Sequence, residues 1–138
     1  MRGYLLDTHI LIWLLSKDDR LNKYIREDIE YFQYPYYVSV ESFREIVMLR
    51  HLKKISISLE RAISYLQQFQ MTLMPIGLNH VKELEKLPEL TFDGEKHNDP
   101  FDRMLIAQAI AEKFTLISAD GKFPFYKKHG LKLLENNI

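Results

Sequence analysis

Four acidic side chains, far apart along the chain, could together hold a divalent metal ion: Asp7, Glu45, Asp102 and Asp120. Asp7 follows the apolar run 4–6, and Asp120 follows a second apolar run at 116–119. In open parallel sheets, functional groups gather at the carboxyl ends of strands, so both aspartates are expected at one sheet edge. Carboxylates placed that close repel one another unless a cation lies between them. Hard oxygen ligands suit Mg²⁺ or Mn²⁺, so the pattern favours a metal-dependent nuclease.

Taken singly, each acid also has an ordinary structural explanation. Asp7 precedes a helical pattern and can cap it. Asp120 precedes Gly121 in a combination that is common in turns. Asp102 lies three residues after Asp99, where a carboxylate interacts favourably with the helix dipole. Turns and caps do not readily explain all the acids together, and Asp99 is itself a further candidate ligand.

Glu45 is the acid whose burial is hardest to explain without a partner. On a helical wheel it falls between two leucines, and burying an unpaired carboxylate is costly. The alternative is an exposed glutamate on a helix with a poorly defined apolar stripe. Glu41, one turn earlier, is a candidate auxiliary ligand. Ser118 would project to the same side as Asp120 and could hold a ligand water or a carboxylate.

Short apolar runs alternate with helical patterns, which is typical of an α/β fold. No repeat or linker divides the chain, so residues 1–138 are expected to form one domain. Strands are expected at Gly3–Leu6, Tyr36–Ser39, Thr72–Ile76, Phe114–Ser118 and Leu131–Leu134. Helices are expected at Thr8–Leu15, Asp19–Tyr31, Val40–Leu52, Leu59–Phe69, Asn79–Leu87, Pro100–Lys113 and, as a short one, Phe123–Lys128. Ser58, Asn79 and Asp99 are expected helix caps, and Pro88–Asn98 is expected to be an exposed loop.

The composition is that of a globular protein without a strong charge preference. Nineteen basic residues balance nineteen acidic ones, which argues mildly against a generic nucleic-acid binder. The chain has no cysteine, which excludes disulfides, zinc–thiolate sites and thiol catalysis. It has no apolar stretch of about 18 residues, and Asp7 and His9 interrupt the apolar start, so neither a membrane span nor a signal peptide is expected. We expect a cytoplasmic protein.

Four segments resemble, in order, the motifs of PIN-domain ribonucleases of the VapC type, the toxin half of a bacterial toxin–antitoxin pair: Leu5–Trp13, Ser39–Ile46, Asn98–Ala109 and Leu116–Asp120. The third segment is very similar to its family motif. The resemblance covers nearly all of the chain.

The resemblance implies a PIN-like three-layer α/β/α sandwich with a mainly parallel central sheet of about five strands. It implies that Asp7, Glu45, Asp102 and Asp120 form the metal-binding acidic quartet. Asp99 would be an accessory acid, and Ser118 stands where the family has a threonine or serine. Arg44 departs from the family, which commonly has an aromatic residue there, and the loop Leu90–His97 is longer than usual. The resemblance also implies a homodimer and a small antitoxin that offers a basic side chain to the acidic pocket.

The expected reaction is hydrolysis of an RNA phosphodiester bond with one or two Mg²⁺ or Mn²⁺ ions. Arg103 and Arg44 are the nearest candidates to bind RNA phosphates, with Lys122 further off. Two alternatives remain open: a PIN-like RNA- or protein-binding module without catalysis, and a structure-specific DNA nuclease. A receiver domain is disfavoured, since Asp7 has no acidic neighbour and no acid follows the run ending at Gly77.

Overall fold

A five-stranded, all-parallel sheet forms the centre of the molecule. The computed structural model describes residues 3–31 and 34–137. The strand order is β3–β2–β1–β6–β7, which confirms the predicted α/β fold with a parallel central sheet. The strands are β1 (Tyr4–Leu6), β2 (Tyr36–Ser39), β3 (Thr72–Met74), β6 (Thr115–Ser118) and β7 (Lys132–Glu135).

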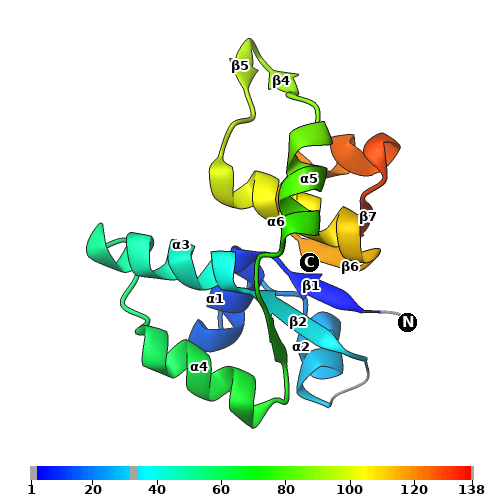
Figure 1. Cartoon of the computed structure of the whole chain (residues 1–138). Helices are drawn as coiled ribbons and strands as arrows, with labels where there is room; N and C mark the ends of the chain where they lie inside the picture. Colours follow the sequence, from blue (N-terminus) through cyan, green and yellow to red (C-terminus); the bar gives the residue numbers. More distant parts are fainter. Residues whose placement is uncertain (1–2, 32–33, 138) are drawn as a thin grey trace.

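Helices cover both faces of this sheet. The helices are α1 (Thr8–Ser16), α2 (Lys23–Glu30), α3 (Val40–His51), α4 (Leu59–Gln68), α5 (Leu78–Lys86), α6 (Pro100–Glu112) and the 3₁₀ helix η1 (Phe123–His129). Figure 1 shows α5 and α6 on one side of the sheet and α1, α2 and α4 on the other. None of the described helices combines the length and the apolar character that crossing a bilayer requires.

Side chains that alternate along each strand feed the two layers of the core. Leu6 and Ile117 belong to a cluster with the apolar residues of α1, α2, α3 and α4. Their neighbours Leu5 and Leu116 belong to a second cluster with α6, η1 and the end of α5. Because successive strand residues point to opposite faces, two adjacent leucines in β1 supply both layers.

Local capping determines where most helices begin. The side chain of Ser39 caps α3 by accepting from the N–H of Glu41, and Ser58 caps α4 as predicted. Helix α2 begins at Lys23, later than predicted, because the side chain of Asn22 accepts from the N–H groups of the first turn. The prediction that Asn79 caps α5 is wrong.

Helix α5 instead begins at Leu78, directly after Gly77. The N–H of Gly77 donates to Nδ1 of the buried His80, at 2.9 Å. The side chain of Asn79 donates to Glu112 on α6, at 3.1 Å. Asn79, which was predicted to cap α5, therefore connects α5 to α6 instead.

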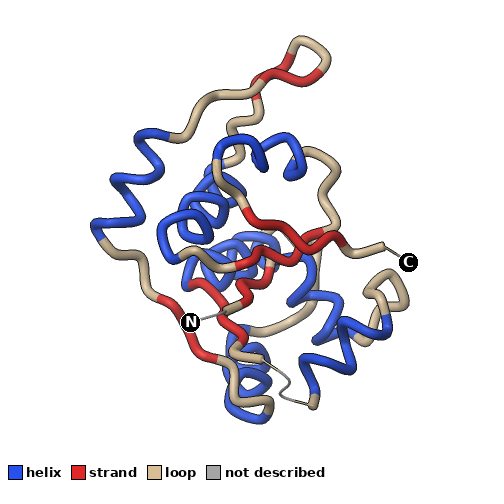
Figure 2. The backbone as a smooth tube through the Cα atoms, turned by 90° about the vertical axis from the view of Figure 1, so that its right-hand side faces the viewer, coloured by secondary structure: helices blue, strands red, loops and turns tan. Residues whose placement is uncertain are grey.

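A β-hairpin replaces the loop predicted between α5 and α6. Strands β4 (Thr91–Phe92) and β5 (Glu95–Lys96) pair antiparallel around Asp93 and Gly94, which have φ of 51° and 81°. Two positive φ values are typical of a type I′ turn, for which Asp-Gly is a preferred pair. Figures 1 and 2 both show the hairpin projecting from the body of the molecule. Its strands were missed because each is only two residues long and three of their four residues are polar.

Candidate active site

The order of the strands brings Asp7 and Asp120 to one edge of the sheet. Strands β1 and β6 are neighbours, with Leu6 opposite Ile117, so the residues that follow both strands meet. The hydroxyl of Ser118 donates to Oδ2 of Asp7 at 2.8 Å and accepts from the N–H of Asp120 at 3.0 Å. Ser118 thus links the two strand ends and holds a carboxylate there.

Helices α3 and α6 bring the other acids to the same place. Helix α3 packs against both α1 and α6, and its buried Glu45 lies in the second turn. The side chain of Asp99 caps α6 by accepting from the N–H groups of Phe101 and Asp102, at 2.9 and 3.1 Å. The four quartet acids and Asp99 all line one open cavity of about 640 Å³. The structure therefore gathers residues that lie 113 positions apart at the extremes, from Asp7 to Asp120.

Burial makes three of these carboxylates, Asp7, Glu45 and Asp102, hard to ionise. Asp7 is only 4% exposed, and burial raises its pKa to about 6 despite the hydrogen bond from Ser118. Burial, together with the negative charges of Asp7 and the neighbouring acids, raises the pKa of Asp102 to about 8. Burial and the charge of Asp7 also raise the pKa of Glu45. Acids perturbed together in one cavity indicate a functional site.

The donor chemistry of the cavity fits a hard divalent cation. Oε1 of Glu45 is buried and has no hydrogen-bond partner among the described residues, which is costly for a carboxylate oxygen. A cation at the quartet would compensate that oxygen and the mutual repulsion of the acids. Within residues 3–31 and 34–137, no three acidic or imidazole side chains are already placed to hold an ion. The side chains would therefore have to turn toward the ion that they bind.

The structure adds His97, which the sequence did not single out. His97 is buried, with Nδ1 2.8 Å from the hydroxyl of Tyr126 and Nε2 3.1 Å from Oδ2 of Asp102. Burial lowers the pKa of His97, which favours the neutral ring. In that form Nδ1 accepts from Tyr126, which orients the ring, and Nε2–H donates to Asp102 and holds its carboxylate in place. No local sequence pattern pointed to this role of His97, because its partner Tyr126 lies 29 positions away along the chain.

Arg103 and Glu41 lie outside the set of residues that line the cavity. The guanidinium of Arg103 donates to the carbonyl oxygens of Pro88 and Leu87, at 3.0 and 2.9 Å. Arg103 therefore ties the start of α6 to the end of α5.

Arg44, the other expected phosphate ligand, also lies away from the cavity lining. It pairs with the buried carboxylate of Glu41, and its guanidinium lies 5.6 Å from the centre of the Phe101 ring. Residues that sequence reasoning did not assign to the site also line the cavity, among them His9, Trp13, Lys96 and His97. Lys122, the more distant candidate, lines it as well.

Comparisons with known proteins agree with this fold. The model of the PIN domain family matches residues 4–129. A chain of VapBC2 from Rickettsia felis, solved with a DNA fragment from their promoter, is 20% identical, with a TM-score of 0.67 over 98% of this chain and 99% of that one. A chain of DNA-bound VapBC from Salmonella typhimurium is 14% identical, with a TM-score of 0.67 over 99% and 100%. A chain of VapBC-1 from nontypeable Haemophilus influenzae is 17% identical, with a TM-score of 0.63 over 96% and 97%. No protein of curated function matched the sequence.

Proposed function

The chain belongs to the PIN domain family, and we propose that it is a metal-dependent endoribonuclease, the toxin of a toxin–antitoxin pair. One observation carries the proposal. Two strand ends and two helices place four carboxylates around one cavity, where the pKa values of three of them are raised. Carboxylates this close repel one another, and a bound cation compensates that repulsion. A scaffold that only bound RNA or protein would have no need of four buried or half-buried acids.

Asp7, Glu45, Asp102 and Asp120 would hold Mg²⁺ or Mn²⁺. When bound, such an ion lowers the pKa of a coordinated water and neutralises charge on a phosphate. Ser118 keeps Asp7 oriented, and His97 keeps Asp102 oriented, through the hydrogen bonds described above. The capping bonds of Asp99 both use Oδ1, which leaves its second oxygen for an accessory role in positioning water.

The partners belong to the same proposal. The three similar structures are VapBC structures, two of them bound to DNA. By analogy, this chain would bind a small antitoxin whose basic side chain enters the acidic cavity. Three exposed apolar side chains are candidates for a homodimer or antitoxin contact: Val47 and Met48 in the C-terminal half of α3, and Leu52 directly after it. An enzyme that cuts cellular RNA would act in the cytoplasm, as expected from the sequence.

The test is cleavage of total RNA by purified, partner-free protein with Mg²⁺ or Mn²⁺ and with EDTA. Asp7→Asn keeps the shape of the side chain and an acceptor for Ser118 but removes the charge, so cleavage should fall by at least about 100-fold. Asp28→Asn, on the exposed face of α2, is the matched control and should cleave like the wild type.

Absence of cleavage by metal-loaded wild type, with RNA binding retained, would favour the binding-module alternative. Metal-dependent cutting of branched or flapped DNA, with RNA left intact, would favour the structure-specific DNA nuclease. Cleavage that persists in EDTA would contradict the role of the quartet.

A further inference from the structure

Helix α1 carries two rings along the wall of the acid-lined cavity. His9 and Trp13 are four residues apart and so lie on one face of the helix, and both line the same cavity as Asp7. Their rings are 6.4 Å apart and meet edge to face. The aliphatic side chains on the other faces of α1 are buried in the core, whereas Trp13 is only partly buried. One part of the indole therefore packs on the core and another part faces the cavity.

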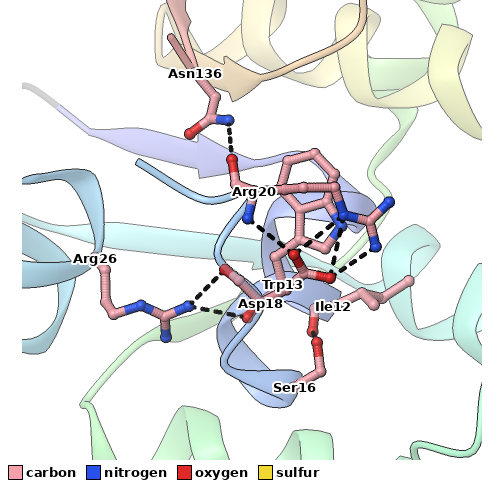
Figure 3. A network of polar contacts seen from close by, with 7 residues as sticks. All are labelled: Ile12, Trp13, Ser16, Asp18, Arg20, Arg26 and Asn136. Atoms are coloured by element: carbon pink, nitrogen blue, oxygen red, sulfur yellow. Dashed lines mark hydrogen bonds and ion pairs between the residues drawn. The ribbon is translucent and has the colours of Figure 1, made fainter. Parts of the chain in front are cut away.

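The indole is held in place before any ligand binds. The guanidinium of Arg20 lies 5.1 Å from the centre of the Trp13 ring. Asp18 fixes that guanidinium through Nη2 to Oδ2 at 2.7 Å and Nε to Oδ1 at 3.1 Å. Arg26 donates to the Trp13 carbonyl at 3.1 Å, and Asn136 donates to the Arg20 carbonyl at 2.7 Å (Figure 3). A ring oriented in advance loses little freedom on binding, which favours affinity.

Charge indicates what Arg20 does in this arrangement. Hydrogen bonds from Arg20 hold the pKa of Asp18 at about 2, so Asp18 stays ionised and neutralises the guanidinium. Arg20 thus supports the ring and is not a free phosphate ligand. The lysines of the cavity are better placed for phosphates, since Lys96 and Lys122 both line it. Lys96 pairs with the exposed Glu89, at 3.1 Å, and such surface pairs are weak.

We propose that Trp13 stacks on an unpaired base of the substrate, beside the acidic quartet, while Lys96 and Lys122 contact adjoining phosphates. This inference rests on the proposed nuclease function and names its substrate class, single-stranded RNA. The cavity of about 640 Å³ is larger than a hydrated ion needs and lies in the range of sites for small organic ligands, roughly 300–1,000 Å³. Aromatic side chains stack on splayed-out bases of single strands, whereas the bases of a duplex already stack on one another.

Fluorescence gives a direct test, because Trp13 is the only tryptophan of the chain. A randomised eight-nucleotide RNA is titrated in Mg²⁺ into Asp120→Asn, which serves to keep the RNA uncut. Saturable quenching of the tryptophan emission is expected, with at least tenfold weaker binding of a blunt RNA duplex. RNA binding detected by anisotropy without a change in emission would overturn the proposal. Equal quenching by the duplex, or tighter binding of single-stranded DNA, would overturn the substrate class.

Two variants of the otherwise unchanged protein separate stacking from folding. Trp13→Leu should raise KM for single-stranded RNA roughly 5- to 100-fold with a smaller change in kcat, since a lost stack weakens binding. Trp13→Phe keeps an aromatic face and should fall between Trp13→Leu and the wild type. Circular dichroism must show that both variants fold.

The same experiment distinguishes the two proposals. If the wild type does not cut RNA with Mg²⁺ or Mn²⁺, the nuclease function fails. If the wild type cuts and folded Trp13→Leu has an unchanged KM, only the stacking site fails.

Discussion

At the scale of single residues, the site is built from acids that the fold keeps in an unfavourable environment. Asp7 is almost fully buried, and its hydrogen bond from Ser118 does not offset the loss of solvation. Asp102 carries a pKa of about 8, so neutral and ionised forms coexist near physiological pH. Without a metal ion, these side chains lower the stability of the fold at pH values above their ordinary pKa. A bound cation stabilises their ionised form. Stability and metal affinity are therefore linked.

The first prediction concerns the pH dependence of the metal-free protein. Because the folded pKa values of Asp7 and Asp102 lie above the unfolded value of 3.8, the native state binds more protons, and stability should fall as pH rises from about 4 to 8. For Asp7 alone the loss is on the order of 3 kcal/mol. Chemical denaturation in EDTA at pH 5 and pH 8.5 measures it, and Asp102→Asn should flatten the profile.

Magnesium should restore more stability at pH 8.5 than at pH 5, since protons compete with the ion for the same carboxylates. A metal-free protein that becomes more stable between pH 5 and 8.5 would contradict the raised pKa values.

The second prediction concerns the hydrogen bonds that orient Asp102. Tyr126→Phe removes one hydroxyl and His97→Phe removes both ring hydrogen bonds, so each should lower Mg²⁺ affinity, by roughly 10- to 100-fold for His97→Phe. Calorimetric titration with Mg²⁺ alone measures this without substrate. His97→Gln retains a donor and should recover part of the affinity.

The matched control is His129→Gln, which replaces an exposed histidine and should bind Mg²⁺ like the wild type. If His97→Phe destabilised the protein yet bound Mg²⁺ normally, His97 would have only a structural role.

At the scale of elements, two connections decide what surrounds the quartet. Asp7 is the N-cap residue of α1, so the first strand, the first acid and the helix that carries Trp13 are continuous in sequence. The hairpin β4–β5 leads directly into His97 and the capped start of α6. Its Phe92 packs edge to face on Phe125 of η1, with ring centres 5.1 Å apart. Although the hairpin projects from the body of the molecule (Figure 1), a residue next to its turn thus contacts η1.

The third prediction tests the hairpin as a phosphate contact. Lys96→Gln should weaken RNA binding and reduce the slope of log affinity against log salt by about 0.7, the value for one phosphate contact on a single strand. Lys82→Gln, on the exposed face of α5, should leave the slope unchanged. The slopes come from binding titrations of the uncut eight-nucleotide RNA at several salt concentrations. Equal slopes for Lys96→Gln and the wild type would remove the hairpin from the RNA path.

At the scale of the whole molecule, the C-terminal segment closes over the start of the chain. After β7, the N–H of Asn136 donates to the Ser118 carbonyl at 2.8 Å. Its side chain accepts from the N–H of Asn22 at 2.7 Å and donates to the Arg20 carbonyl. One residue therefore joins the end of β6, the cap of α2 and the support of Trp13. Asn136 thus belongs to the architecture of the site although it is not among the residues that line the cavity.

The fourth prediction follows from these contacts. Asn136→Ala removes two side-chain hydrogen bonds and should lower the free energy of unfolding by roughly 1–3 kcal/mol. It should also lower the fluorescence anisotropy of Trp13, because Arg20 loses a hydrogen bond that holds it and the indole becomes more mobile. Denaturant unfolding and fluorescence anisotropy measure the two effects. Asn137→Ala is the neighbouring control, and an equal effect of both variants would show that the tail acts only through its backbone.

The sequence by itself was enough to predict the order of the helices and of the five strands of the central sheet, the bounds of six of the seven predicted helices to within two residues at each end, and the four quartet acids that line the cavity. Those features are local: apolar runs, caps such as Asp99 and Ser58, and a carboxylate directly after a strand. The family resemblance rested on the same short segments. Each needs only neighbouring residues to be recognised.

Only the tertiary structure decided which polar groups meet. The register of β1 with β6 joins Ser118 to Asp7, and the packing of η1 against α6 joins Tyr126 through His97 to Asp102. The tertiary structure also directs Arg103 toward backbone carbonyls. Lys96 lines the cavity, where Arg103 was expected. Hydrogen bonds between residues distant in sequence depend on how whole elements pack, and no local pattern encodes them. Burial has the same origin, which is why the raised pKa values of Asp7 and Asp102 follow from the fold and not from their neighbours in the chain.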